Sequence, residues 1–288
     1  MITLQNITKR FGKKTALHNI SYTVQPGSVF ALLGENGAGK TTTIRILLGL
    51  CEPDDGKATV LGLDPMRNDY EIRRRIGYVP EQPALYDWMT VSQIGQFTAS
   101  FYEGGFWTEY CRLVYGFQLP FDTKIKNLSK GQRAKVSLAL ALSHDPELLI
   151  LDEPTSGLDA MVRREFLESM VDRASTGKTV FLSSHQIGEV ERVADTVAIL
   201  KQSELRLVER LDDLKTSAHL LTVTLKTEGD FSCPLETVVQ RQTEGRNVRI
   251  LGRNLDPAAT NILQQDENVA QFEIRQPSLE EIFLAYMN

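Results

Sequence analysis

Positions 34–42 read Gly-Glu-Asn-Gly-Ala-Gly-Lys-Thr-Thr and lie between the apolar run 29–33 and a helical pattern. Glycines in such a turn leave the backbone free to curl its N–H groups around phosphate oxygens, and the next helix directs its positive end at the same anion. Lys40 is placed to reach the outer phosphates, and the Thr41 hydroxyl to ligate a metal ion. This spacing is that of a P-loop, so we expect a nucleoside triphosphate and magnesium to be bound by Gly34, Glu35, Asn36, Gly37, Ala38, Gly39, Lys40, Thr41 and Thr42.

Two carboxylates end a second apolar run. Asp152 and Glu153 directly follow Leu-Leu-Ile-Leu at 148–151. An acid at the end of a buried strand parallel to the P-loop strand can hold magnesium, and Asp152 fits that role beside Thr41. Glu153 would then project near the terminal phosphate, where a carboxylate can polarise an attacking water. The alternative is that both acids only offset the dipole of a following helix.

A further helix start carries a second anion-binding pattern. Ser129 stands where an N-cap belongs, Gly131 allows close backbone approach, and residues 132–143 have a strong helical pattern. The N-terminus of such a helix attracts an anion in the same way as the P-loop helix. By itself the segment is equally consistent with an ordinary capped helix.

The residues at this helix start, Leu-Ser-Lys-Gly-Gln, resemble the signature sequence of ABC ATPases, which is usually Leu-Ser-Gly-Gly-Gln. Three further segments resemble stations of that family: the D-loop at 155–159, the switch histidine His185 after the apolar segment 180–184, and Phe11 at the aromatic position that stacks on adenine. The resemblance covers residues 1–215 and implies that the nucleotide is ATP. It implies catalytic roles for Glu153 and His185. It also implies contact with the ATP of a second copy by the signature residues Leu128, Ser129, Lys130, Gly131 and Gln132, and a D-loop made by Ser156, Gly157, Leu158 and Asp159.

The glutamine loop departs from the usual pattern of the family. In Tyr-Val-Pro-Glu-Gln at 78–82, Glu81 occupies the usual glutamine position directly after Pro80, and Gln82 follows one step later. Either side chain could approach the magnesium and the attacking water. We take Gln82 as the catalytic and metal-binding residue, and the choice between it and Glu81 stays open at this point.

The order of apolar and polar segments predicts an α/β protein with two parts. Half-buried strands at 2–8 and 16–24 predict an antiparallel β subdomain, while alternating buried strands and helices predict a mostly parallel P-loop NTPase sheet covered on both faces. An aromatic-rich helical insert is expected at about 86–144, broken at Gly104-Gly105, with Tyr86 and Trp88 exposed. Residues 216–288 predict an accessory α+β domain with strands at 220–225, 247–251 and 269–274, a helix at 256–265, and a last helix that Ser278 and Glu281 cap.

The bulk composition is that of an ordinary globular chain. A net charge of −5 argues against a nucleic-acid-binding surface, and Cys51, Cys111 and Cys233 lack the spacing of a metal site or disulfide framework. The apolar runs are far too short to cross a bilayer, and no leader-like segment precedes the first strand, so a cytoplasmic location is expected.

The resemblance implies a mechanism as well as a fold. The signature helix and P-loop of one ABC ATPase chain face away from each other, so a second copy completes each site, most simply in a homodimer. The C-terminal segment 276–283 is similar to that of ATPases serving ABC-2-type exporters, which implies an export system at the inner face of the plasma membrane with separate membrane permease subunits. The rivals are a soluble ABC ATPase of DNA repair or translation, and a non-catalytic nucleotide-switch module. The cargo is not readable from this chain.

Overall fold

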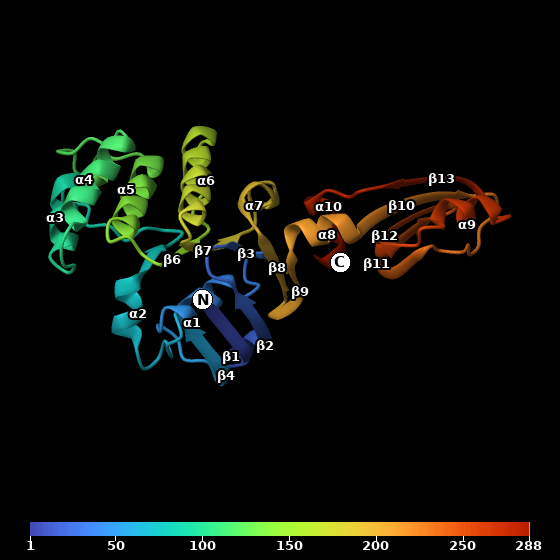
Figure 1. Ribbon diagram of the computed structural model, residues 1–288, viewed down its shortest axis with the longest axis horizontal. Helices are drawn as coiled ribbons and strands as arrows, with labels where there is room; N and C mark the ends of the chain where they lie inside the picture. Colours follow the sequence, from blue (N-terminus) through green and yellow to red (C-terminus); the bar gives the residue numbers. More distant parts are fainter. Residues whose placement is uncertain (288) are drawn as a thin grey trace. The chain divides into compact units, whose positions relative to one another are not determined.

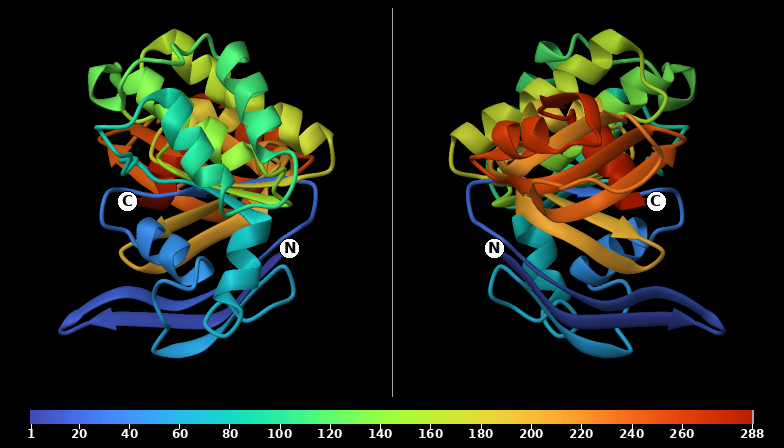
Figure 2. Two further views of the ribbon diagram at one scale, coloured as in Figure 1. Left: turned by 90° about the vertical axis from the view of Figure 1, so that its left-hand side faces the viewer. Right: turned by 90° about the vertical axis from the view of Figure 1, so that its right-hand side faces the viewer.

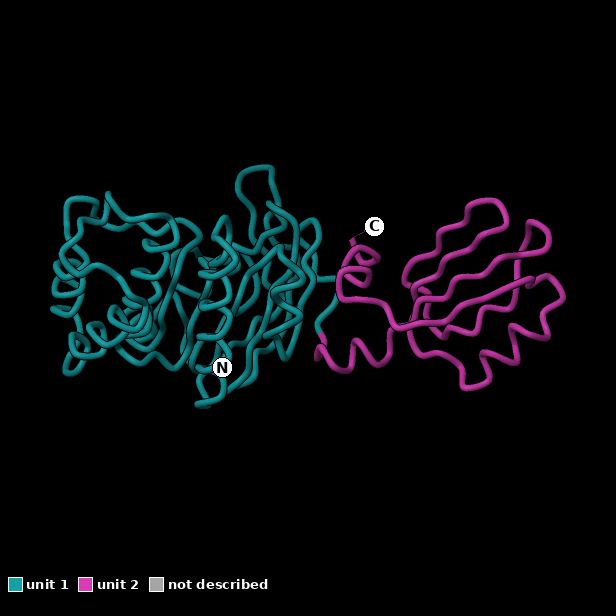
Figure 3. The backbone as a smooth tube through the Cα atoms, turned by 90° about the horizontal axis from the view of Figure 1, so that it is seen from above, with its two compact units in different colours: residues 1–208 teal, residues 209–288 magenta. Residues whose placement is uncertain are grey.

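The computed structural model describes residues 1–287 and divides the chain into two compact units, residues 1–208 and 209–288 (Figure 3). The sequence analysis placed this boundary after residue 215. None of the helices that residues 1–287 form has the length and apolar character needed to span a bilayer.

The centre of the first unit is a six-stranded sheet in the order β5-β6-β7-β3-β8-β9. Strands β5, β6, β7, β3 and β8 are joined by parallel pairings, as predicted. Every residue of β3, β6 and β7 is buried, because both faces of this sheet are covered. The strands are β3 (Val29–Leu33), β5 (Ile76–Val79), β6 (Leu148–Asp152), β7 (Thr179–Ser184), β8 (Thr196–Lys201) and β9 (Glu204–Arg210).

One face of the central sheet packs against helix α1 (Lys40–Leu47) and a three-stranded antiparallel sheet. That sheet has the order β2-β1-β4, with β1 (Ile2–Phe11), β2 (Lys14–Val24) and β4 (Asp55–Val60), and forms the predicted antiparallel subdomain. Helices α6 (Ala160–Ser175) and α7 (Ile187–Val193) lie on the opposite face (Figure 1). The short helix α2 (Asp69–Arg75) was not expected, because of its seven residues only Ile72 is buried.

The helical insert forms a subdomain with its own core. It contains α3 (Val91–Ala99), α4 (Phe106–Gly116), the 3₁₀ turn η1 (Ile125–Asn127) and α5 (Lys130–Leu142), the green helices at the top of Figure 2, left. Gly104 and Gly105 separate α3 from α4 in left-handed conformations, with φ of +55° and +77°. The core includes Phe106, Tyr110 and Val114, so most aromatics of the insert serve packing.

The second unit is a four-stranded antiparallel sheet in the order β11-β12-β10-β13, with three short helices. Its core takes alternate residues of the central strands, among them Leu221 and Val223 of β10 and Ile250 of β12, together with Leu263 of α9. The elements are α8 (Leu211–Ser217), β10 (Ala218–Leu225), β11 (Leu235–Glu244), β12 (Asn247–Leu255), α9 (Ala259–Gln265), β13 (Val269–Arg275) and α10 (Leu279–Met287).

The sequence analysis predicted the cap of the last helix in this unit but not one of its strands. The capping box before α10 is confirmed, because the backbone N–H of Glu281 donates to Oγ of Ser278 at 3.2 Å and that of Ser278 to Oε2 of Glu281 at 3.0 Å. Strand β11 was missed. It is an edge strand of mostly exposed polar residues, so it lacks the alternation of apolar residues that marks a half-buried strand.

Candidate functional site

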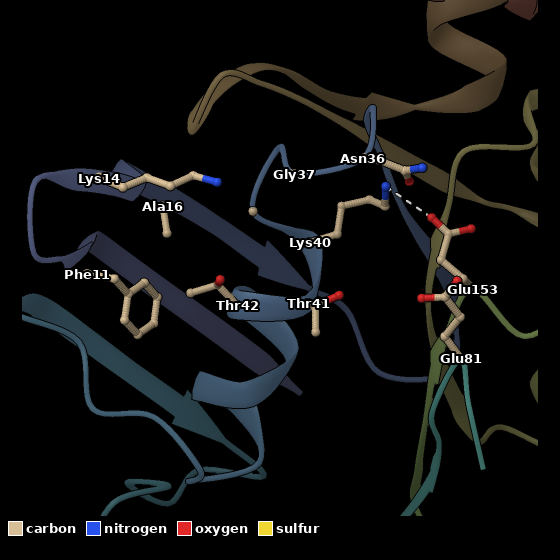
Figure 4. Close-up of a pocket in the computed structure, with 11 residues that line it drawn as sticks. Phe11, Lys14, Ala16, Asn36, Gly37, Lys40, Thr41, Thr42, Glu81 and Glu153 are labelled. Carbon is tan, nitrogen blue, oxygen red and sulfur yellow. Dashed lines mark ion pairs between the residues drawn. The ribbon is translucent and has the colours of Figure 1, made fainter.

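The P-loop connects the end of β3 to the start of α1 and wraps around the ammonium group of Lys40. Nζ of Lys40 donates to the carbonyl oxygen of Gly34 at 2.6 Å and to that of Glu35 at 3.2 Å. Lys40 is only 5% exposed. The loop therefore holds this lysine at the base of the pocket, where its charge points toward the space that phosphate groups would fill (Figure 4).

Glycine is needed at two positions of this loop for reasons of space. A Cβ on Gly39, whose φ is +118°, would lie 2.5 Å from the carbonyl oxygen of Ala16 and 2.7 Å from Cδ2 of Leu17. A Cβ on Gly34 would lie 2.5 Å from the carbonyl oxygen of Leu200. These contacts press the loop against β2 and β8, and so fix the direction of the α1 N-terminus.

The two carboxylates after β6 have different environments. Asp152 is 3% exposed and accepts a hydrogen bond from Oγ of Ser183, on the neighbouring strand β7, at 2.6 Å. Glu153 has a left-handed backbone, with φ of +48°, and its N–H donates to the carbonyl oxygen of Ser183 at 3.1 Å. This turn directs Glu153 out of the strand and toward Lys40 (Figure 4).

Glu153, which is buried, contacts both the buried Lys40 and the exposed side chain of His185. Its Oε1 lies 3.0 Å from Nζ of Lys40, and its Oε2 lies 2.7 Å from Nδ1 of His185, the residue after β7. The backbone N–H of His185 also donates to Oε2, at 3.3 Å. Three residues expected at the phosphate end of the site are thus brought together from three parallel strands at their common carboxyl edge.

A pocket of about 370 Å³ opens between these residues and the hairpin of β1 and β2. Phe11, at the end of β1, is half exposed on its wall, and Nζ of Lys9 lies 5.4 Å from the centre of its ring. The pocket is lined by Phe11, Lys14, Ala16, Asn36, Gly37, Gly39, Lys40, Thr41, Thr42, Glu81 and Glu153 (Figure 4). An aromatic wall at one end and a lysine with helix N–H groups at the other suit a nucleotide.

The residue that the glutamine loop places in this pocket is Glu81, beside Glu153 in Figure 4. Glu81 also lines a neighbouring cavity with Lys130 and Ser156, and Gln82 lines that cavity but not the pocket. Of the two candidates for the glutamine-loop role, Glu81 is therefore the one that lines this pocket. The carboxylates of Glu81 and Asp152 and the hydroxyl of Thr41 are oxygen donors, the ligand type that hard divalent cations prefer.

The negative charge of Asp152 also affects the phenol of Tyr78, on β5. Burial, reinforced by the negative charge of Asp152, raises the pKa of Tyr78 to about 12. The phenol therefore stays protonated and neutral at physiological pH next to the sheet edge that carries the carboxylates.

The signature segment forms the capped helix start that the sequence predicts. Ser129 Oγ accepts from the N–H of Gln132 at 3.2 Å, and Oε1 of Gln132 accepts from the N–H of Ser129 at 2.9 Å, a complete capping box. None of the signature residues lines the nucleotide pocket of its own chain. Within this chain the signature helix start and the P-loop therefore belong to different surfaces.

The D-loop connects Glu153 to helix α6. Oδ1 of Asp159 accepts from the N–H groups of Met161 and Val162, each at 3.0 Å, and so caps α6. Gly157 has a left-handed backbone, with φ of +67°, and Nζ at the flexible end of the Lys130 side chain lies over its Cα. The departure from the usual signature thus places an ammonium group against the D-loop of the same chain.

Comparison with known proteins decides the family. A family profile described as ABC transporter matches residues 17–156. The chain is 31% identical to the uncharacterised ABC transporter ATP-binding protein YhaQ of Bacillus subtilis, over 99% of this chain and 97% of that protein. The chain belongs to the ABC transporter ATP-binding proteins. It is an ATP-binding and ATP-hydrolysing member of that family, with the α/β fold expected from its sequence.

Other relatives and solved structures extend the comparison. The chain is 39% identical to an uncharacterised ABC transporter ATP-binding protein of Nostoc, spanning 63% of that protein, and 32% identical to Nod factor export ATP-binding protein I of Rhizobium, spanning 95% of it. The structure of an ATP-binding subunit of an ABC transporter superposes with a TM-score of 0.70 at 29% identity, covering 75% of this chain and 92% of that one. The dimeric structure of a bacterial ABC transporter cassette has a TM-score of 0.66 at 26% identity, covering 73% and 99%.

Sequence reasoning missed two pocket residues of this ABC ATPase. Lys14 and Ala16 lie on β2, which enters the pocket beside Phe11. The sequence indicated their position in part, because a tight turn after Phe11 brings the next strand alongside it. The pairing of Phe11 with Lys14 is defined only by the sheet.

Proposed function

We propose that this ABC ATPase energises an exporter, as a head-to-tail homodimer held at the inner face of the plasma membrane by a separate membrane permease. The observation that carries the proposal is the contact of Glu153 with both Lys40 and His185, where Lys40 and Glu153 line the pocket and the signature helix start does not. A site of this kind binds phosphate at the P-loop of one copy and is completed by the signature helix start of a second copy. The dimeric relative and the relative described as an export protein support it.

Residues of one chain supply the phosphate end of the site. Lys40 and the N–H groups at the start of α1 would bind the outer phosphates, while Thr41 and Asp152 would hold Mg²⁺. When bound, Mg²⁺ neutralises phosphate charge. Glu153 would accept a proton from the attacking water, and His185 holds the Glu153 carboxylate in place through the 2.7 Å contact.

Glu81 is our choice for the glutamine-loop role. Glu81 lines the pocket as well as the neighbouring cavity, whereas Gln82 lines the neighbouring cavity but not the pocket. A carboxylate there adds a negative charge that Mg²⁺ compensates.

The partner copy would supply the second half of the site. Ser129, at the N-cap of α5, and the N–H groups of the first turn form an anion-binding surface, and Lys130 adds a positive charge. Enclosing the triphosphate between two helix starts excludes water and concentrates positive potential on the terminal phosphate. ATP therefore favours the closed dimer, and hydrolysis allows it to open.

An aromatic ridge on the helical subdomain is our candidate surface for the permease. Tyr86 and Trp88 are 49% and 64% exposed, as the sequence analysis expected. Their rings are 6.1 Å apart, Phe97 packs edge-on to Tyr86 at 5.6 Å, and Phe101 packs on Phe97 at 5.3 Å. These four contacting rings remain exposed and form a contiguous apolar patch. Such a patch marks an interaction surface, whereas single exposed apolar residues are normal. A short amphipathic helix of the permease would cover it.

Co-purification from detergent-solubilised membranes tests this proposal. Tagged wild-type protein should retain a polytopic membrane protein, and the Trp88→Ala and Phe101→Ala variants should lose most of it while phosphate release by the isolated subunit stays the same. Tyr115→Ala, which truncates a ring that is 87% exposed elsewhere in the same subdomain, is the control. Recovery of the wild type without any membrane protein would instead favour a soluble role in DNA repair or translation.

A further inference from the structure

A buried carboxylate behind the switch histidine has no part in the chemistry described so far. Glu189 lies on α7, four residues after His185, and is only 7% exposed. Burying a carboxylate is unfavourable unless it is paired and hydrogen-bonded. The partners of Glu189 therefore indicate what this side chain is placed to hold.

One oxygen of Glu189 binds the segment that follows the catalytic carboxylate, and the other faces an arginine of α6. Oε2 accepts a hydrogen bond from Oγ1 of Thr155, which is 2% exposed, at 2.5 Å. Oε1 lies 3.0 Å from Nε of Arg163, on α6. Nη2 of Arg163 donates to the carbonyl oxygen of Leu158, in the D-loop, at 3.1 Å. Glu189 and Arg163 thus fasten both ends of residues 155–158 to α7.

The same segment packs against the signature helix. Nζ of Lys130 lies over Gly157, and a Cβ on Gly131 would lie 3.1 Å from Cγ2 of Val162, on the first turn of α6. The signature helix start therefore contacts the D-loop through Lys130 and packs against the first turn of α6 through Gly131, beside the cavity that Lys130 and Ser156 line. A displacement of the D-loop displaces the surface on which the signature residues sit.

We infer that Glu189, with Thr155 and Arg163, is a positioning residue that couples the switch histidine of one ATP site to the signature helix that completes the other. His185 contacts Glu153 two residues before α7 begins, and Glu189 of α7 binds Thr155 at the start of the D-loop segment. When ATP changes the position of His185, α7 carries the D-loop and the signature helix start with it. This inference rests on the proposed dimer, in which that helix start meets the partner's ATP.

The test measures coupling between sites separately from nucleotide binding. In the Glu153→Gln background, which should retain ATP, Glu189→Gln and Arg163→Gln should raise the dissociation constant of the ATP-dependent dimer about tenfold, within the usual range of coupling between sites. ATP binding to the monomer should stay within about twofold, because no P-loop contact is lost. With Glu153 intact, both variants should lower kcat. Arg164→Gln, which breaks an exposed pair with Glu168 on the same helix, is the matched control and should change neither quantity.

A double variant distinguishes a connected network from two separate packing defects. If Glu189 and Arg163 act as one unit, the combined variant should weaken the dimer no more than the worse single variant does. Losses that multiply, or a Glu189→Gln dimer as tight as that of Arg164→Gln, would overturn the inference. Should Glu189→Gln fail to fold, Thr155→Val removes only the hydroxyl contact and takes its place. A Glu153→Gln parent that does not dimerise with ATP overturns the proposed function too, whereas a parent that dimerises confines any failure to this inference.

Discussion

Replacing Glu153 with glutamine should separate ATP hydrolysis from ATP binding. The amide has nearly the same shape and keeps one oxygen, for either the N–H of His185 or Lys40, but it cannot accept a proton from water at physiological pH. General-base catalysis contributes about 10²- to 10⁴-fold, so kcat should fall by that factor, equivalent to about 3–5 kcal/mol. Phosphate release under saturating ATP measures this loss.

The same variant should bind ATP more tightly. Nζ of Lys40 lies 3.0 Å from Oε1 of Glu153, so a terminal phosphate competes with this carboxylate for the lysine. A hydrogen bond to a charged group contributes about 1 kcal/mol more than one to a neutral group, which corresponds to about a fivefold lower Kd for ATP in the variant. Calorimetric titration measures the Kd, and sedimentation in ATP shows whether the variant accumulates as a dimer.

Glu168→Gln makes the same chemical change at an exposed position of α6 and should leave both quantities unchanged. A Glu153→Gln protein that releases phosphate at a rate within about tenfold of the wild type would refute the assignment of Glu153 as the base. A higher Kd for ATP in the Glu153→Gln variant than in the wild type would refute the competition between carboxylate and phosphate for Lys40.

Three further predictions concern neighbouring parts of the molecule. Lys40→Ala should weaken ATP binding about 10- to 150-fold, the value of a hydrogen bond to a charged group, and unchanged binding in calorimetry would count against the P-loop assignment. Glu81→Ala should raise the Mg²⁺ concentration needed for half-maximal phosphate release, while Gln82→Ala should change it little, and the reverse order would return the role to Gln82. His144, whose Nε2 lies 3.0 Å from the carbonyl oxygen of Ile76, has its pKa lowered from 6.5 by burial. The folded state therefore resists protonation, so stability is fully present above pH 6.5 and declines as pH falls below it; chemical denaturation at about pH 7.5 and about pH 5.5 should show a smaller decline for His144→Gln than for the wild type.

The parts of the site that are contiguous in sequence could be predicted from it. The P-loop, the carboxylates Asp152 and Glu153, and the N-cap at Ser129 each depend on residues within a few positions of one another, and their turn and cap geometry is local. The buried strands were also evident, because continuous apolar runs between helical patterns are typical of parallel sheets. Strand β11 and helix α2 were missed because few of their residues are buried.

What only the tertiary structure decided is which distant residues meet. The contacts of Glu153 with Lys40 and His185 depend on how strands β3, β6 and β7 line up at one edge of the sheet, which no local pattern records. That Glu81 lines the pocket while Gln82 does not likewise depends on the path of one loop, which the sequence does not specify. Short-range hydrogen bonding therefore determined the individual motifs, and long-range packing determined how they form a site.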